Sequence, residues 1–239
     1  MKAFVISLKR SIDRRERIEQ QLRAVGIPFE FFDAIDGSID NFTYSDRARP
    51  AITKKRKGYS LKTNEIACFA SHYSIWEKCL SLNKAIIVIE DNVDPAIDAK
   101  AIIELCFKQI EQYNYIKLSA THKSNFYPIK SIISDYKLGS YQKGTCGTTA
   151  YILTPKAARY FIRNATSFLE PVDDYMEKPW RHHVQTYSVQ PNLFSRANIA
   201  STIGAKRKKK IGITAFNKIY IELYRIYESL MKSLYWKNK

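Results

Sequence analysis

The sequence predicts an α/β fold with a mainly parallel central sheet, and three observations support this prediction. Segments with strand character alternate with segments of helical periodicity along most of the chain, which is typical of βαβ units. Residues 85–89 form an unbroken, mostly β-branched apolar run, as expected for a strand that is buried on both faces. Hydrophobic residues make up 45% of the chain, which is enough for a packed core.

The N-terminal part contains two predicted strands and one helix. Residues 3–8 form an apolar strand, and residues 13–25 form a charged amphipathic helix that ends at Gly26. A second strand is expected at residues 28–32. Residues 41–62 are basic and show no regular pattern, and long irregular segments in compact domains are usually functional lids or disordered loops.

The middle of the chain continues the alternation of helices and strands. Helices are predicted at residues 64–82 and 99–112, and strands at 86–89 and 115–119.

Two short β segments are expected within residues 139–154, where Gly144 and Gly147 interrupt the pattern. Residues 155–164 then form a helix that begins with proline in its first turn.

Acidic residues follow the apolar run at 85–89. Glu90, Asp91 and Asp94 come directly after it, and Pro95 is expected to end regular strand pairing. Ligands bind at the carboxyl ends of strands in open α/β sheets. Oxygen ligands there suit Mg²⁺ or Mn²⁺ with a phosphate-bearing substrate. The alternative interpretation is a polar turn that is acidic by chance.

The charge balance is strongly basic. Lysine and arginine exceed aspartate and glutamate by 39 − 23 = 16, which favours anionic partners such as nucleic acid, acidic lipid surfaces or phosphorylated substrates. No nucleic-acid-binding motif accompanies this charge, so nucleic acid is not the expected partner. The four cysteines are widely spaced and include no C-x-x-C pair, which argues for a reducing cytosol. No segment suits a signal peptide or a membrane span.

The C-terminal residues differ from the rest of the chain. A polybasic run at 206–210 precedes a helical pattern with a basic side and an apolar stripe. The stripe consists of Phe216, Ile219, Tyr220, Leu223, Ile226, Tyr227, Leu230 and Leu234. A basic cluster beside such a helix predicts contact with an anionic membrane surface. Packing of the stripe on its own domain, or on a second subunit in a homodimer, are the alternatives.

Several blocks of sequence share, in order, the motifs of one family. They are residues 4–15, 31–37, 61–76, 90–92, 144–158 and 171–174. Together these blocks resemble glycosyltransferase family 25, the bacterial lipooligosaccharide-biosynthesis glycosyltransferases, and they cover most of residues 3–175.

The resemblance implies a GT-A-like nucleotide-diphospho-sugar transferase domain over residues 1–204, and the basic helical extension then occupies residues 205–239. It also implies a UDP-sugar donor, Mn²⁺ (or Mg²⁺) as cofactor, and transfer with inversion of a hexose, most often galactose. The acceptor would be a growing lipooligosaccharide or lipopolysaccharide. We therefore expect a hexosyltransferase at the cytoplasmic face of the inner membrane of a bacterium.

The family's motifs also imply a set of donor-binding residues. In this sequence they are Ser7, Leu8, Arg14, Asp36, Glu65, Ser71, His72 and Glu90. Arg14 would meet the pyrophosphate through charge-assisted hydrogen bonds, and Asp36 would reach the uridine side. The alternatives are a solvated helix charge for Arg14 and a structural hydrogen bond to the neighbouring loop for His72.

The implied metal ligands are Asp91 and Asn92. The family usually carries two consecutive aspartates after the glutamate, and here the second is Asn92. A neutral amide oxygen holds a divalent ion less tightly than a carboxylate does. Asp94 or the donor's phosphates could compensate.

An inverting transfer needs a general base, and the implied candidates are Asp173 and Asp174. Two adjacent carboxylates in a partly buried site raise one pKa, which suits a base. The alternative is a pair that caps the following helix. His182 and His183 could bind a metal or a phosphate, although surface histidines are the simpler interpretation.

Two other functions remain open at this point. One is a transferase that uses UDP-glucose or a UDP-N-acetylhexosamine. The other is a non-catalytic polyanion-binding protein whose acidic motif has decayed at Asn92. Pocket side chains that choose between sugar epimers act through a few hydrogen bonds, and no sequence motif identifies them.

Overall fold

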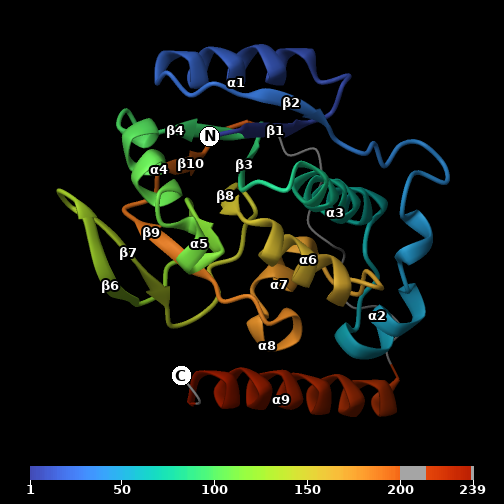
Figure 1. Cartoon of the computed structure of the whole chain (residues 1–239). Coiled ribbons are helices and arrows are strands. Elements are labelled where there is room, and N and C mark those ends of the chain that lie inside the picture. The colour runs from blue at the N-terminus through green and yellow to red at the C-terminus, as the bar shows by residue number, and fades with distance from the viewer. Residues whose placement is uncertain (200–213, 238–239) are drawn as a thin grey trace.

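The computed structural model describes residues 1–199 and 214–237. An eight-stranded sheet of order β2-β1-β3-β8-β5-β9-β7-β6 forms the centre of the molecule (Figure 1). Strand β1 (Ala3–Ser7) pairs in parallel with β2 (Glu30–Asp33) and with β3 (Ile86–Glu90). The carboxyl ends of these three strands therefore meet at one edge of the sheet, where open α/β folds place their ligands.

The other half of the sheet is mixed. Strand β8 (Ala150–Leu153) is antiparallel to both β3 and β5 (Tyr115–Lys117), and β5 is parallel to β9 (Tyr187–Gln190). The hairpin of β6 (Phe126–Ile133) and β7 (Tyr136–Tyr141) completes the sheet through an antiparallel β7–β9 pair. A mainly parallel sheet was predicted, and that arrangement holds for β2-β1-β3 and for the β5–β9 pair.

Helices cover both faces of the sheet. One face packs against α1 (Ile12–Ala24) and α4 (Ala99–Phe107), and the other against α3 (Thr63–Leu82), α6 (Pro155–Asn164) and α7 (Val172–Met176).

The two helical layers explain why β1 and β3 are apolar at every position before their last residues, Ser7 and Glu90. Val5 and Ile87 belong to the core on the α1 and α4 side, whereas Phe4, Ile6 and Val88 belong to the core on the α3 and α6 side. Successive side chains in a strand point to opposite faces, so a strand between two helical layers has no polar face.

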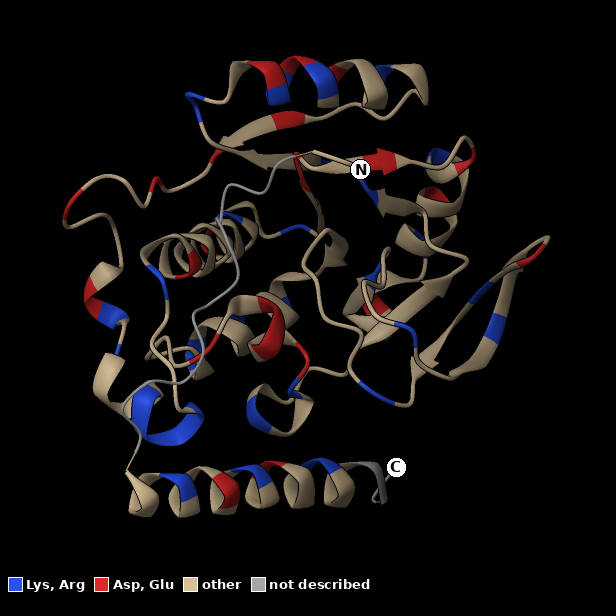
Figure 2. Cartoon of the chain, turned by 180° about the vertical axis from the view of Figure 1, so that it is seen from behind, with Lys and Arg blue, Asp and Glu red and all other residues tan. Residues whose placement is uncertain are grey.

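A helix lies in the segment 41–62 that showed no regular pattern. After a 3₁₀ turn at Ser45–Arg47, helix α2 (Pro50–Lys57) begins with proline in its first turn and ends at Gly58, whose φ is 75°. Four basic residues form its last turn, where cations interact favourably with the helix dipole. Figure 2 shows this turn as a basic band near the start of the C-terminal helix.

Other departures from the predictions are local. The helix expected at 99–112 is two helices, α4 and α5 (Ile110–Tyr113), separated at Lys108 and Gln109. Strand β6 and the short helix α8 (Pro179–His182) have no predicted counterpart. The chain after β3 forms β4 (Val93–Pro95), which ends at Pro95 and pairs antiparallel with β10 (Phe194–Arg196).

Helix α9 spans Ala215–Lys237 and lies at the opposite end of the molecule from α1 (Figure 1). Within residues 1–199 and 214–237, no helix is both long enough and apolar enough to cross a bilayer. The predicted boundary at 204/205 and the polybasic run at 206–210 lie outside the described residues.

Candidate active site

A cavity opens at the carboxyl ends of β1 and β3, between the loop after β2 and one face of α3. Its empty volume is ≈ 770 Å³ with the open mouth included. Most of the residues with a predicted role in donor or metal binding line it. They are Ser7, Leu8, Arg14, Asp36, Ser71, His72, Glu90, Asp91 and Asn92.

Asp91 ties β1, α1 and β3 together at the base of the cavity. The hydroxyl of Ser7 donates to its Oδ2 at 2.7 Å, and Arg14 forms an ion pair with Oδ1. Both carboxylate oxygens are therefore engaged by the protein, and the side chain is buried. Arg14 is not the solvated helix charge of the alternative interpretation, because its side chain is only 17% exposed.

Glu90 belongs to a chain of polar contacts that reaches into the core. Its Oε1 lies 3.6 Å from Nε2 of His72, whose Nδ1 is 2.9 Å from the hydroxyl of Tyr151. Thr148 donates to the same carboxylate from the other side. Desolvation opposes ionisation of Glu90, but His72, Thr148 and the charge of Arg196 outweigh it and hold the pKa of Glu90 below its ordinary value. His72 thus contacts a core tyrosine and a cavity carboxylate, and not the neighbouring loop of the alternative interpretation.

The loop after β2 is fixed from two sides. Arg10 forms a fork with Asp36, with Nη2 3.2 Å from Oδ1, and it holds the pKa of Asp36 well below its ordinary value. Ser71 on α3 accepts a hydrogen bond from the backbone N–H of Ile35 at 2.8 Å. Asp36 and Ser71 therefore shape the cavity wall.

Asp173 and Asp174 lie in the first turn of α7 without capping it, since the N-cap residue is Pro171 and makes no side-chain cap bond. Oδ2 of Asp173 accepts from the backbone N–H of Gly147 at 3.5 Å. The pKa of Cys68, a thiol that lines the cavity, is raised well above its ordinary value by desolvation and then by Glu90 and Asp173. Asp173 is therefore close enough to the cavity for its charge to act on a thiol that lines it.

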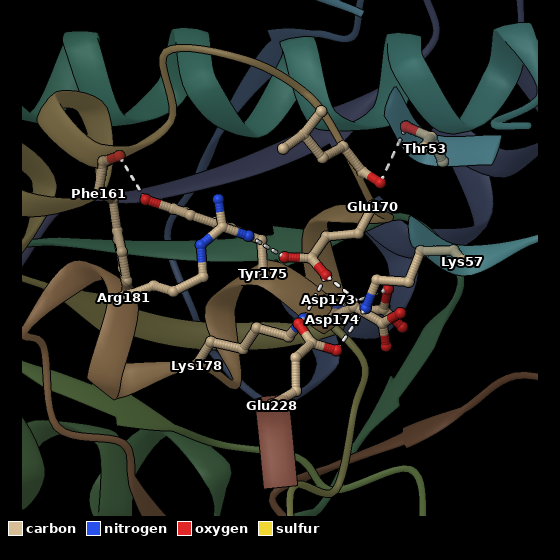
Figure 3. Close-up of polar contacts among 11 residues, drawn as sticks. Thr53, Lys57, Phe161, Glu170, Asp173, Asp174, Tyr175, Lys178, Arg181 and Glu228 are labelled. Atoms are coloured by element: carbon tan, nitrogen blue, oxygen red, sulfur yellow. Dashed lines mark hydrogen bonds and ion pairs between the residues drawn. The ribbon is translucent and has the colours of Figure 1, made fainter. Parts of the chain in front are cut away.

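Asp174 lies toward a cluster of charged residues next to α2 and α9 (Figure 3). Desolvation is the main cause that raises the pKa of Asp174 to about 6, and the neighbouring charges of Asp173 and Glu170 add to it. Lys178 and Lys57 act in the opposite direction. The predicted upward shift for one member of the carboxylate pair therefore falls on Asp174.

We expect the substitution Asp174→Asn to stabilise the protein at pH 8 by on the order of 1–2 kcal/mol, after allowance for solvent screening. A folded-state pKa above the unfolded value means that the folded chain binds the proton more tightly, so wild-type stability falls as the pH rises from about 4 to 6. The gain should therefore be present above pH 6 and vanish near pH 4. Thermal melts at both pH values test this, with Asp135→Asn in the exposed β6–β7 turn as the control. Equal melting of variant and wild type at pH 8 would contradict it.

The residues of this site fall within a match to a known protein family. A sequence profile described as "Glycosyltransferase family 25 (LPS biosynthesis protein)" matches residues 1–176, which include the cavity residues up to Asn92 and both aspartates of α7. The chain belongs to glycosyltransferase family 25. The resemblance inferred from the motif blocks is thereby confirmed.

Relatives of this glycosyltransferase come from bacteria and animals. The lipooligosaccharide biosynthesis protein lic2B of Haemophilus influenzae is 29% identical over 206 residues, which is 80% of this chain and 74% of that protein. Procollagen galactosyltransferase 1-A of Xenopus laevis is 26% identical over 77% of this chain and 32% of that protein. Inactive glycosyltransferase 25 family member 3 of Homo sapiens is 34% identical over 45% of this chain, but only 19% of that protein. This chain thus spans less than a third of the two animal relatives.

The cavity of the transferase does not contain a preformed metal cage. Across residues 1–199 and 214–237, no three His, Cys, Asp or Glu side chains converge to hold an ion. Asp91, a predicted metal ligand, is occupied by Ser7 and Arg14. Arg17 pairs with Asp94, which leaves Asp94 poorly placed to compensate. One observation favours a ligand here: Oδ1 of Asn92 is buried and has no hydrogen-bond partner among the described residues. A single neutral oxygen does not fit the requirements of Mn²⁺ or Mg²⁺.

Two predicted site residues have other positions. Glu65 does not line the cavity; its Oε2 accepts from the backbone N–H of Lys62 at 2.8 Å and so caps α3. His182 is not a surface histidine. It is fully buried against Phe161 and Tyr175, and desolvation lowers the pKa of His182 to about 3. His183 is exposed, as the simpler interpretation expected.

Arg196 is a cavity residue that the sequence motifs did not identify. The β4–β10 ribbon places it opposite Val93, and the adjacent Ala197 donates from its backbone N–H to the Asn92 carbonyl at 2.8 Å. Its side chain lines the cavity and has no ion pair or hydrogen bond to any residue that the structure describes. Its pairing partner lies 103 positions earlier in the chain.

Proposed function

We propose that this chain transfers a hexose, most often galactose, from a UDP-sugar to a lipooligosaccharide or lipopolysaccharide acceptor with inversion. The observation that carries the proposal is the convergence of nine predicted site residues around one cavity, with Asp173 beside it. Two relatives support the acceptor class and the sugar, respectively: lic2B is a lipooligosaccharide biosynthesis protein, and the other is a procollagen galactosyltransferase. The expected GT-A-like fold is part of the same proposal.

Cationic side chains are the natural partners of the donor's diphosphate in this cavity. Arg196 carries a charge that the described protein does not neutralise through an ion pair, and Arg14 lies across the cavity on α1. A planar guanidinium binds phosphate oxygens through parallel hydrogen bonds. As the bond between the sugar and the phosphate breaks, negative charge develops on the leaving nucleotide, and a fixed cation stabilises it.

Asp173 is our candidate for the general base. In the transfer, the acceptor hydroxyl oxygen forms a bond to the anomeric carbon while Asp173 takes its proton. The bond between that carbon and the donor phosphate breaks, and the nucleotide diphosphate leaves with the electron pair. Position decides between the two aspartates before pKa does, and Asp173 is the one nearer the cavity.

We expect UDP and UDP-galactose to stabilise the protein in the presence of EDTA. A ligand at about 100 times its Kd contributes about 2.7 kcal/mol, which corresponds to roughly 5–10 °C in a chain of this size. The measurement is a thermal-shift panel of UDP, UDP-galactose, UDP-glucose, UDP-N-acetylglucosamine and GDP-mannose, with and without Mn²⁺.

The variant Arg196→Met should lose at least half of the UDP shift, whereas Arg159→Met, which removes an exposed cation of α6, should not. A shift that appears only with Mn²⁺ would show that Asn92 and the diphosphate complete a metal site. The absence of a shift with every nucleotide would overturn the proposal.

A non-catalytic polyanion-binding protein is the second candidate, and Asn92 is the observation that favours it. The residue replaces a family carboxylate, and the cavity lacks a metal cage among the described residues. Salt-sensitive binding to nucleic acid, together with no response to UDP, would support this candidate. If the donor is UDP-glucose or a UDP-N-acetylhexosamine, that nucleotide sugar would instead give the larger thermal shift in the panel.

A further inference from the structure

Helix α9 presents its apolar stripe to the outside of the molecule. Seven of the eight stripe residues named from the sequence are between 53% and 76% exposed, and only Tyr220 turns partly inward. They are Phe216, Ile219, Leu223, Ile226, Tyr227, Leu230 and Leu234. Among the residues of α9 whose burial the structure describes, Ile221 alone is fully buried. Packing of this stripe on its own domain is therefore excluded.

The inward side of α9 is held by charges and aromatic rings. Glu228 forms ion pairs with Lys57 of α2, at 2.7 Å, and with Lys178, which precedes α8. Nζ of Lys55 lies 4.8 Å from the ring centre of Tyr220, and the guanidinium of Arg56 lies 5.2 Å from that of Tyr224. These cation–π contacts and ion pairs fix which side of α9 faces the domain.

A buried carboxylate organises the cations that hold Glu228 (Figure 3). Glu170 is 1% exposed and pairs with Lys178, with Arg181 at 2.5 Å and with Lys57 at 3.1 Å. Lys57 and Lys178 therefore bridge Glu170 in the domain to Glu228 on the helix. Charged pairs of this kind require defined geometry, so α9 cannot turn over to bury its stripe without breaking them.

An amphipathic helix on a protein surface normally buries its apolar stripe, and α9 does the opposite. Seven large apolar side chains in one row form a patch of the kind that marks an interaction site. The outward orientation therefore requires an external partner.

The charges beside the stripe indicate which partner it is. Lys54 and Lys55 of α2 are exposed, and so are Lys218 and Arg225 of α9. Figure 2 shows the basic turn of α2 beside the start of α9. The sequence adds five consecutive basic residues at 206–210 and a net charge of +16. A second copy of this chain would bring its own cations against these basic residues, and the like charges would repel. Anionic lipid headgroups would neutralise the basic residues instead.

We propose that the outward stripe of α9 inserts into the interfacial region of an anionic lipid bilayer, with the basic residues of α2 and α9 at the headgroups. The helix would then lie in the membrane plane, as basic amphipathic helices do. This inference rests on the proposed function only in its consequence, namely that a lipid-linked acceptor would share the bilayer with the enzyme.

The test is co-sedimentation of the full chain with vesicles of phosphatidylcholine alone and of phosphatidylcholine with 30% phosphatidylglycerol. We expect binding to the anionic vesicles that weakens in high salt. The triple variant Leu223→Ser, Ile226→Ser, Leu230→Ser should bind at least tenfold more weakly. All three side chains are more than half exposed, so the variant should fold normally.

The matched control replaces three isoleucines elsewhere that are also more than half exposed, Ile97→Ser, Ile129→Ser and Ile133→Ser, and should bind like wild type. Failure of the wild type to sediment with anionic vesicles would overturn the proposal, as would full binding by the α9 variant. A dimer in analytical ultracentrifugation that the α9 substitutions dissociate would assign the stripe to a second copy. The UDP thermal shift of the α9 variant, measured in parallel, separates loss of membrane binding from failure of the proposed donor site.

Discussion

Asp173→Asn is expected to lower kcat by about 10²–10⁴-fold, which is the usual contribution of a general base. The substitution removes the group that takes the acceptor proton but keeps an oxygen that can accept from Gly147. Donor binding should therefore be preserved, because Asp173 does not line the cavity in which the UDP-sugar is proposed to bind. The measurement is initial-rate sugar transfer at saturating donor, with the UDP thermal shift as evidence that the variant is folded and binds nucleotide.

Asp174→Asn is the matched control for activity, since it makes the same change one residue along α7. We expect it to keep transfer activity within tenfold of wild type. Loss of activity in Asp174→Asn with normal activity in Asp173→Asn would exchange the two roles. Full activity in both variants would show that neither aspartate of α7 is the general base.

Glu170→Gln should destabilise the protein by roughly 3–5 kcal/mol, because it leaves buried cations without their central counter-charge. Lys178, Arg181 and Lys57 all pair with this carboxylate, and Glu228 pairs with only two of them, Lys57 and Lys178. In a chain of this size the loss corresponds to a decrease in Tm on the order of 10 °C. Thermal and urea unfolding at pH 8 measure it.

The pH dependence provides a second check on Glu170. Burial alone would raise its pKa, but Lys178, Lys57 and Arg181 outweigh burial and hold the pKa of Glu170 below its ordinary value of 4.5. Its contribution to stability is therefore present above about pH 4.5 and is lost as the pH falls further. The difference between wild type and Glu170→Gln should shrink in acid.

A surface carboxylate is the control for Glu170. Glu19 pairs with Arg23 on the outer side of α1, and Glu19→Gln should change stability by less than about 1 kcal/mol. If Glu170→Gln and Glu19→Gln have the same Tm, the ion pairs around Glu170 do not stabilise the fold as proposed.

The parallel half of the fold and most of the cavity were predictable from sequence, because their signals are local. The run that becomes β3 is apolar at every position, and its acidic end falls where β1 and β3 terminate together. Helix α2 had local signals too, in Pro50 and Gly58, but its four basic residues in one turn hid any apolar periodicity.

The parts that escaped prediction depend on contacts between distant residues. Arg196 reaches the cavity only because β10 pairs with β4. Glu65 lies outside the cavity because its carboxylate caps α3 by accepting a hydrogen bond from Lys62. The stripe of α9 was visible in the sequence, but its outward direction was not. Lys57, Lys178 and Glu228 set that direction, and they lie far apart in the chain.

Trp76 shows how the candidate active site can constrain the hydrophobic core beneath it. Its indole N–H donates to the hydroxyl of Tyr151 at 3.1 Å, and that hydroxyl lies 2.9 Å from Nδ1 of His72. When the tyrosine hydrogen points at Nδ1, the neutral imidazole carries its own hydrogen on Nε2, toward Glu90. A phenylalanine at position 76 would fill much of the same space and still lose the first donor of this series. Substitution at this buried position is therefore limited by the hydrogen bond that the side chain must donate as well as by side-chain volume.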